Sequence, residues 1–180
     1  MSRRGRDGKF IAGGAESYDA SSSFPLVPEM GSSSSPTGNG AIGVAISGAV
    51  FFNPFEGDGS GTIANNDNET IDSVPCIDAC GGHPLPNAIS YHYHGIPFCI
   101  TDSVDMPGEH SVLIGYLLDG YPIYGPQDVD GAEPTDLDEC LGHVGPTPEF
   151  EEDTYHYHVT SVENFITDCY SGVATAQSRR

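Results

Sequence analysis

Short apolar stretches alternate with polar positions along this chain, and sustained helical periodicity is missing. Residues 41–55 are apolar and alternating enough for a buried strand or hairpin, with Gly48 at a turn or bulge. Residues 112–124 form the most apolar run, and Asp119-Gly120 breaks it with a strong hairpin-turn signal. Pro122 lacks a backbone N–H, so we expect the return strand to lie at an edge or to be irregular. The pattern predicts a mainly β fold.

The tetrapeptide Tyr-His-Tyr-His occurs twice, at residues 91–94 and 155–158. Strict alternation of residue types that favour strands predicts extended backbone at both copies. In a strand the two histidines of each copy point to one face and the two tyrosines to the other. We expect the tyrosines to pack in the core.

The surroundings of the two copies also repeat. Cys-x-Gly-His precedes each copy, at residues 80–83 and 140–143, and a further cysteine follows each. Residues 43–54 also align without a gap with residues 115–126. We therefore predict a single, internally duplicated, Gly/Pro-rich domain with few short helices. The predicted order is a Ser/Gly-rich N-terminal arm, two halves of a domain spanning 37–172, and a C-terminal tail: 1–36, about 37–100, about 108–172 and 173–180.

Composition narrows the class of protein. The 180 residues include 23 Gly and 14 Pro, which favours short strands and many turns in one domain. The formal charge of −20, from 26 acidic and 6 basic residues, argues against binding to a nucleic-acid backbone. No segment is apolar enough over a sufficient length to be a transmembrane segment.

Four of the five cysteines stand at matching places in the two halves, which predicts a disulfide-stapled domain. The repeat suggests Cys80 with Cys99 and Cys140 with Cys169, while pairing across the halves or a Cys76–Cys80 bridge remains open. Cys76 is the odd cysteine, free or intermolecular. Disulfides indicate an oxidising setting, so we expect a secreted or cell-surface protein whose signal peptide was removed or precedes the printed start. Asn68 begins an Asn-Glu-Thr glycosylation sequon.

The repeated histidines are the candidate metal ligands. A His-x-His strand points two imidazoles the same way, and the histidine of Cys-x-Gly-His adds a third. Imidazole suits copper or zinc, with iron also possible. The two candidate sets are His83, His92 and His94 in the first half and His143, His156 and His158 in the second. One four-histidine cluster across the two strands, or a purely structural hydrogen-bonded network, are the alternatives.

Other polar residues carry weaker signals. Asp119 fits a turn role, and Asp138 and Glu139 fit either orientation of a ligand histidine or a helix N-cap. Adjacent side chains in a strand point apart, so His110-Ser111 does not predict a hydrolase. Residues 128–131 resemble part of a calcium loop but lack the rest of its twelve-residue pattern, so they predict an acidic solvated loop, with calcium binding in the acidic loops as the alternative.

Taken with His83-Pro84, His110-Ser111 and the segments 118–126 and 137–140, both Tyr-His-Tyr-His copies show that the sequence resembles the YHYH-domain family over about residues 38–172. That family consists mostly of secreted or surface proteins, so the resemblance implies a location and a fold and assigns no reaction. Cys76 has no counterpart in the second half.

The sequence thus predicts an extracellular transition-metal-binding domain, with no small-molecule substrate assigned. The alternative is a structural subunit of an extracellular homo-oligomeric or filamentous assembly. In that case the histidines are structural and the N-terminal arm mediates self-association, with residues 24–27 along a neighbour's sheet edge.

Overall fold

The computed structural model describes residues 23–55, 77–84, 91–161 and 165–175 in full, together with strand backbone at 2–4, 10–12, 70–71 and 74–75. Over this part of the chain the protein is mainly β, with one short helix, α1 (Phe98–Val104). The mainly β prediction is confirmed. Among the same residues, no helix has the length and apolar character needed to cross a membrane.

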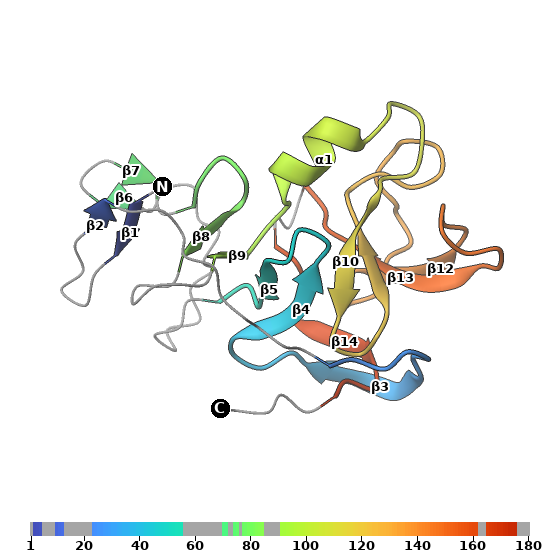
Figure 1. Ribbon diagram of the computed structural model, residues 1–180. Helices are drawn as coiled ribbons and strands as arrows, with labels where there is room; N and C mark the ends of the chain where they lie inside the picture. The colour runs from blue at the N-terminus through green and yellow to red at the C-terminus, as the bar shows by residue number, and fades with distance from the viewer. Residues whose placement is uncertain are drawn as a thin grey trace.

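Eight strands form the main sheet (Figure 1). Their bounds are β4 (Ala41–Ala45), β5 (Val50–Phe52), β8 (Gly82–Pro84), β9 (Tyr91–Tyr93), β10 (Leu113–Leu117), β11 (Pro122–Tyr124), β12 (Gly142–Gly145) and β13 (Thr154–His158). Their spatial order is β12-β13-β11-β10-β4-β5-β9-β8. Three two-stranded sheets complete the described strands: β1 (Ser2–Arg4) with β2 (Phe10–Ala12), β6 (Thr70–Ile71) with β7 (Val74–Pro75), and β3 (Met30–Pro36) with β14 (Cys169–Gly172).

The strand order reads the same from the centre outwards in both halves. The central pair, β4 and β10, is antiparallel, and each of these strands forms a hairpin with the next one out. Each hairpin then pairs in parallel with the strand that carries Tyr-His-Tyr-His, and that strand pairs antiparallel with an outer strand. The halves are thus arranged alike in the sheet, while gene duplication as the cause stays a prediction.

The two halves join at a glycine-lined seam. Gly43 pairs with Leu117 and Gly115 pairs with Ala45 across β4 and β10. A Cβ on Gly43 would lie 2.5 Å from the carbonyl oxygen of Tyr116, and a Cβ on Gly115 would lie 2.2 Å from that of Val44. Backbone atoms therefore fill the space that a side chain would need, and only glycine allows this approach.

The core lies along both hairpins and the inner face of the Tyr-His-Tyr-His strands. Phe51 and Ile123 occupy equivalent hairpin positions and have no exposed surface. Tyr93, Tyr155 and Tyr157 belong to the same buried cluster, and Tyr91 packs against it. These tyrosines lie in or against the core, as their alternation with the histidines predicts.

Asp119 is fully buried beneath the β10–β11 turn. Its carboxylate accepts hydrogen bonds from the Tyr157 hydroxyl at 2.5 Å, the Gly172 N–H at 3.0 Å and the Tyr121 N–H at 3.2 Å. Burial raises the pKa of Asp119, and these hydrogen bonds oppose the rise. The turn role expected for Asp119 is therefore only part of its function, because the side chain also ties β13 and β14 to the turn.

The structure bears on two expectations, the position of the strand that begins at Pro122 and the contacts of the N-terminal arm. Strand β11 lies between β10 and β13, so it is not an edge strand. Its pairing with β10 is irregular, which is the other form expected from Pro122, because the register shifts between Leu113 and Gly115. The parallel pairing with β13 begins at Ile123, one residue further on, so the missing N–H of Pro122 breaks no bond of that ladder. The N-terminal arm, expected to contact a neighbouring subunit, also makes contacts within its own chain. Phe24 stacks on Tyr116 with ring centroids 5.5 Å apart, and β3 pairs with β14.

Replacing Gly115 with alanine tests the seam. We expect Gly115→Ala to lower the free energy of unfolding by about 1–3 kcal/mol, because the new Cβ forces β4 and β10 apart. Chemical denaturation measures this change. Gly145→Ala is the matched control, since the nearest atom to its Cβ would be 3.6 Å away, an ordinary contact. Equal stability of the two variants would contradict the role given to the seam.

Candidate metal centres

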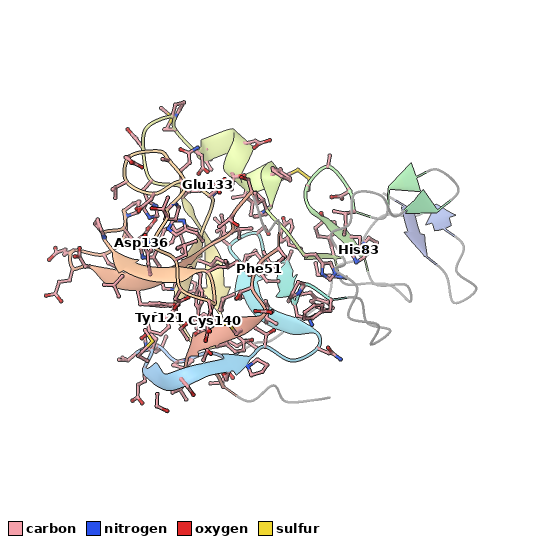
Figure 2. The ribbon with its side chains drawn as sticks, turned by 180° about the vertical axis from the view of Figure 1, so that it is seen from behind. Phe51, His83, Tyr121, Glu133, Asp136 and Cys140 are labelled. Atoms are coloured by element: carbon pink, nitrogen blue, oxygen red, sulfur yellow. A yellow bond between two sulfur atoms is a disulfide. The ribbon has the colours of Figure 1, made fainter. Side chains whose placement is uncertain are left out.

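The structure forms two separate histidine clusters, one at each end of the main sheet. In antiparallel register His83 lies opposite His92 and His143 lies opposite His156, so an outer strand supplies one imidazole to each His-x-His pair. Figure 2 shows His83 on one side of the molecule and Asp136, which contacts His143, on the other. Four strands separate β9 from β13, which rules out the alternative of one four-histidine cluster across the two copies.

We call the cluster of the second half the distal centre; it consists of His110, His143, His156, His158 and Asp128. The Nε2 atoms of His143 and His156 lie 3.0 Å apart, and those of His110 and His156 lie 3.4 Å apart. Two imidazole nitrogens bound to one tetrahedral Zn²⁺ at about 2.0–2.1 Å lie about 3.3 Å apart. The spacing of these nitrogens therefore matches the ligand spacing around a single metal ion.

Asp128 stands at the rim of the distal centre. Its carboxylate oxygens lie 4.0 Å from Nε2 of His110 and 4.0 Å from Nε2 of His143. Two overlapping groups have their ligand atoms within 4.8 Å of one another: His110 with His156 and His158, and Asp128 with His143 and His158. His158 belongs to both groups, which places it at the middle of the donor set.

Hydrogen bonds to acceptor oxygens fix the tautomers of the distal histidines. Nδ1 of His110 lies 2.7 Å from the Ser111 carbonyl, and Nδ1 of His156 lies 2.8 Å from that of Thr154. Nδ1 of His158 lies 2.7 Å from the Gly125 carbonyl. A carbonyl oxygen only accepts, so each Nδ1 carries the proton and donates it, and each neutral ring presents a bare lone pair at Nε2.

The remaining distal imidazole follows the same rule with a carboxylate. Nδ1 of His143 lies 3.0 Å from Oδ1 of Asp136 and donates to it, so its Nε2 is the atom that faces the other imidazoles. Nε2 of His158 is buried with no hydrogen-bond partner. Four Nε2 atoms thus converge, each on a ring whose Nδ1 already bonds to an oxygen, an arrangement that a bound cation stabilises.

The cluster of the first half, which we call the proximal centre, consists of His83, His92 and His94. Their ligand atoms lie within 4.8 Å of one another, with Nε2 of His92 and His94 3.0 Å apart. Nδ1 of His94 donates to the Asn53 carbonyl at 2.9 Å, just as His158 donates to Gly125. The end of each hairpin therefore orients the second histidine of its Tyr-His-Tyr-His strand.

Aromatic rings shield both centres. The Phe52 ring stacks on His92 with centroids 4.0 Å apart. Tyr124, at the equivalent place in the second half, has its ring 4.7 Å from that of His110 and 5.3 Å from that of His156. The Tyr124 hydroxyl donates to Glu149 at 2.7 Å, and burial and this bond raise its pKa.

Burial keeps three of these histidines, His94, His156 and His158, neutral. Burial, with His83 nearby, lowers the pKa of His94 to about 4, and burial lowers that of His158 to about 3. Burial also lowers the pKa of His156 to about 4, with a smaller contribution from His143 and His110. A neutral imidazole is the form that binds a metal ion.

The structure brings together all six histidines expected as ligands, each in its own half, and adds two residues that the sequence interpretation did not assign. From sequence, His110 stands out only as the neighbour of Ser111, and Asp128 only as part of an acidic, calcium-like loop. The Ser111 hydroxyl instead donates to Asp105 at 2.7 Å. The signal for His110 was available, since it is the seventh histidine in a chain whose other six fall into repeated motifs.

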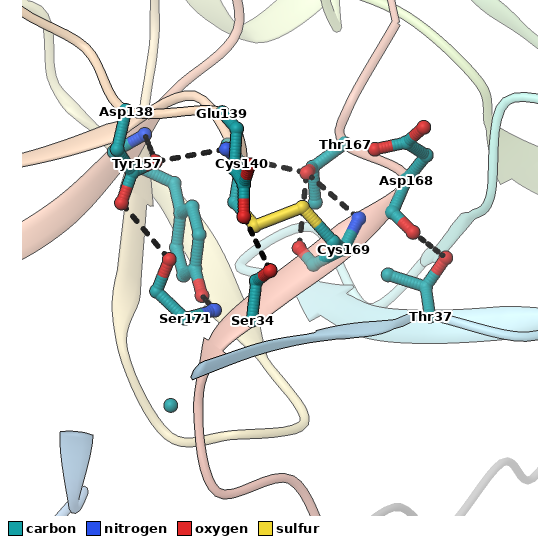
Figure 3. The surroundings of a disulfide bond; sticks show 12 residues. Ser34, Thr37, Asp138, Glu139, Cys140, Tyr157, Thr167, Asp168, Cys169 and Ser171 are labelled. Atoms are coloured by element: carbon teal, nitrogen blue, oxygen red, sulfur yellow. Dashed lines mark hydrogen bonds between the residues drawn. A yellow bond between two sulfur atoms is a disulfide. The ribbon is translucent and has the colours of Figure 1, made fainter. Parts of the chain in front are cut away.

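Asp138 neither orients a ligand histidine nor caps a helix, so both expectations for it are wrong. Its Oδ1 accepts from the Cys140 N–H at 2.9 Å and the Gly142 N–H at 3.0 Å. Its Oδ2 accepts from the Ser171 hydroxyl at 2.9 Å (Figure 3) and from the Tyr155 hydroxyl at 2.8 Å. Asp138 therefore shapes the loop that leads into β12, and Glu139 accepts from Ser34.

The first half contains the same carboxylate loop. Asp78 accepts from the Cys80 N–H and from the Tyr91 hydroxyl, each at 2.8 Å. Both loops turn through a residue with positive φ, which is Gly81 at 80° in the first half and Leu141 at 67° in the second. The Asp-x-Cys-x-Gly-His sequence thus delivers His83 and His143 to equivalent positions.

Both disulfides that the repeat suggests are present. Cys80 bonds to Cys99, and Cys140 bonds to Cys169 (Figure 3), with Cα atoms 4.9 and 5.2 Å apart. Cys76 and the sequon residue Asn68 lie outside the described residues. In the acidic, calcium-like loop, Asp128 accepts from the Val129 N–H and Asp130 from the Ala132 N–H, so both carboxylates cap their own turn.

Comparison with known proteins supports the family resemblance. A sequence model of the YHYH protein family matches residues 21–135 and 127–172. The chain therefore belongs to the YHYH protein family. No curated protein and no solved structure matches it.

The neutral histidines predict an acid-sensitive metal-free protein. The pKa of His158 is about 3 when folded, against an ordinary value of 6.5, so the stability it contributes is fully present above pH 6.5 and is lost as the pH falls toward 3. Between pH 7 and pH 5 we expect His158 to account for a loss of about 1–2 kcal/mol. Urea unfolding of the chelator-treated protein at both pH values measures it. The non-titrating variant His158→Gln should lose less over the same interval, and an equal loss would contradict the assignment.

Proposed function

We propose that this protein is an extracellular transition-metal-binding protein with two histidine centres. The observation that carries the proposal is the convergence of Nε2 lone pairs in the distal centre, where Nδ1 of every imidazole already donates to an oxygen. A set of imidazole nitrogens favours copper or zinc, with iron as a further candidate, over the oxygen-seeking calcium and magnesium ions.

The location is part of the proposal. Two disulfides support an oxidising compartment, because cytosolic thiols are kept reduced. The acidic composition supports a protein that attracts cations from solution, since a charge of −20 raises their local concentration near the surface. No reaction follows from these features alone.

Elemental analysis tests the proposal. Protein purified without chelator or affinity nickel should contain copper, zinc or iron at two equivalents. His92→Ala/His94→Ala and His156→Ala/His158→Ala should each lose one equivalent, because each removes two of the converging donors from one centre. Glu151→Ala/Glu152→Ala, which alters exposed acidic residues, controls for non-specific cation binding. Absence of metal from the wild type, or equal metal in all variants, would refute the proposal.

One observation favours a second function, self-association through the N-terminal arm. Leu26 and Val27 are 95% and 80% exposed, although Phe24 beside them packs on its own chain. Two adjacent exposed apolar side chains suit a contact with another subunit.

Charging these two positions tests self-association. We expect Leu26→Asp/Val27→Asp to shift an oligomer toward the monomer in size-exclusion chromatography with light scattering, because carboxylates oppose burial of this segment. Val144→Asp serves as the control, because Val144 is also 63% exposed but lies on β12. A monomeric wild type would refute this second function and leave metal binding untouched.

A further inference from the structure

We propose that the two centres have different coordination chemistry, and that only the proximal centre keeps a position open to an external ligand. Its three imidazoles would hold a metal ion that also binds water, hydroxide or a small anion. The distal centre would instead be closed by its fourth imidazole and by Asp128. This inference rests on the metal binding proposed above and extends it to the kind of ligand that each metal ion exchanges.

The histidine count sets the difference between the centres. The chain has seven histidines, and the structure places three in the proximal centre and four in the distal centre. Every imidazole of the chain is thus assigned, and none is left to complete the proximal set. Among the described residues, no carboxylate or thiol joins the proximal group either.

Alignment of the two halves shows which residue of the first half corresponds to His110. The two hairpins share one register, in which Gly43 faces Phe51 and Gly115 faces Ile123. His110 lies five residues before Gly115, and the residue five before Gly43 is Gly38. Gly38 has no side chain, and its backbone faces open space, because a Cβ built on it would meet nothing within 4 Å. The proximal centre therefore lacks the group that His110 supplies to the distal centre.

His110 is held firmly in place by the segment that follows α1. Asp105, just after the helix, accepts from the Ser111 hydroxyl at 2.7 Å and from the Val112 N–H at 2.9 Å. The Ser111 hydroxyl in turn accepts from the Gln127 N–H at 2.9 Å. These bonds fix the two residues that follow His110, so its imidazole is a built part of the distal centre.

Asp128 adds to the closure of the distal centre. It follows Gln127 directly, and its carboxylate lies 4.0 Å from two of the imidazole nitrogens, close enough to become a further ligand after a small movement. Structural zinc sites fill all four positions with protein ligands, whereas catalytic sites use three and leave the fourth to water. By this rule the distal centre is of the structural type and the proximal centre of the exchangeable type.

Access to the proximal centre agrees with this assignment. His92 and His94 are 1% and 3% exposed, but His83 is only partly buried on β8, the outermost strand of the sheet. Its counterpart His143 is buried. His83 is therefore the part of the proximal centre that reaches the protein surface.

Azide binding to the copper-loaded protein tests the inference. The full chain is loaded with Cu²⁺, its copper content is measured, and azide is titrated while the azide-to-copper charge-transfer absorption is recorded. We expect His156→Ala/His158→Ala, which retains the proximal centre, to develop this band and to saturate at a single azide per copper. His92→Ala/His94→Ala, which retains the distal centre, should bind copper and show no band.

A gain-of-function variant provides the second arm. The double change His110→Gly/Asp128→Asn in the His92→Ala/His94→Ala background copies Gly38 into the second half and also removes the carboxylate that could fill the vacated position. It should make the distal copper responsive to azide. Added imidazole should then suppress the azide band by occupying the vacated position. This second test does not require that the His156→Ala/His158→Ala variant fold.

The outcomes separate the two proposals. An azide band from the intact distal centre, or no band from a copper-loaded proximal centre, would overturn the inference while leaving metal binding in place. The same holds if the His110→Gly/Asp128→Asn variant keeps its copper and stays silent to azide. Failure of the wild type to bind copper, zinc or iron would overturn the proposed function itself.

Discussion

The antiparallel pairing of β4 with β10 is the contact on which the rest of the sheet depends. Each hairpin begins at this seam, and every further strand of either half is added outwards from it. At this seam the backbones of β4 and β10 lie so close that no Cβ fits between them. Gly43 and Gly115 allow this approach because they have no side chain. Because the strand order is the same in both directions, one central contact determines that the two histidine clusters lie far apart.

The positions of the imidazoles follow from the backbone more than from contacts between side chains. Asn53 and Gly125 end the two hairpins, and their carbonyls hold the rings of His94 and His158. Because β5 and β11 pair in parallel with the Tyr-His-Tyr-His strands, these carbonyls come next to the histidines that they orient. The register of the sheet thus directs the Nε2 lone pairs, and a slip by one residue would turn the histidines to the core face.

Local pattern was enough to predict the two central hairpins and the Tyr-His-Tyr-His strands, and it suggested the disulfides and the two three-histidine sets. It did not predict β3, which lies in the expected N-terminal arm. Alternation predicts which face a histidine takes, and the repeated cysteines suggest their own partners. His110 and Asp128 could not be placed in this way, because they lie in loops whose position depends on tertiary contacts such as Asp105 with Ser111. The same limit applies to Asp138, whose Asp-x-Cys-x-Gly turn uses a carboxylate where a helix N-cap was an equally simple interpretation. Pro122 has no backbone N–H, and this favours an edge strand. The sequence does not show that the parallel pairing of β11 with β13 begins one residue later, at Ile123, where the missing N–H does no harm.

Because every histidine belongs to one of two clusters, spectroscopy of the unmodified protein reports on the clusters directly. All seven side chains belong to a cluster, so the imidazole region of a nitrogen-15 NMR spectrum would contain no background signals from surface histidines. The chain also has no tryptophan, so its ultraviolet emission comes from tyrosines, several of which stand beside the histidines on the same strands. The state of each cluster is therefore open to observation in the unmodified protein.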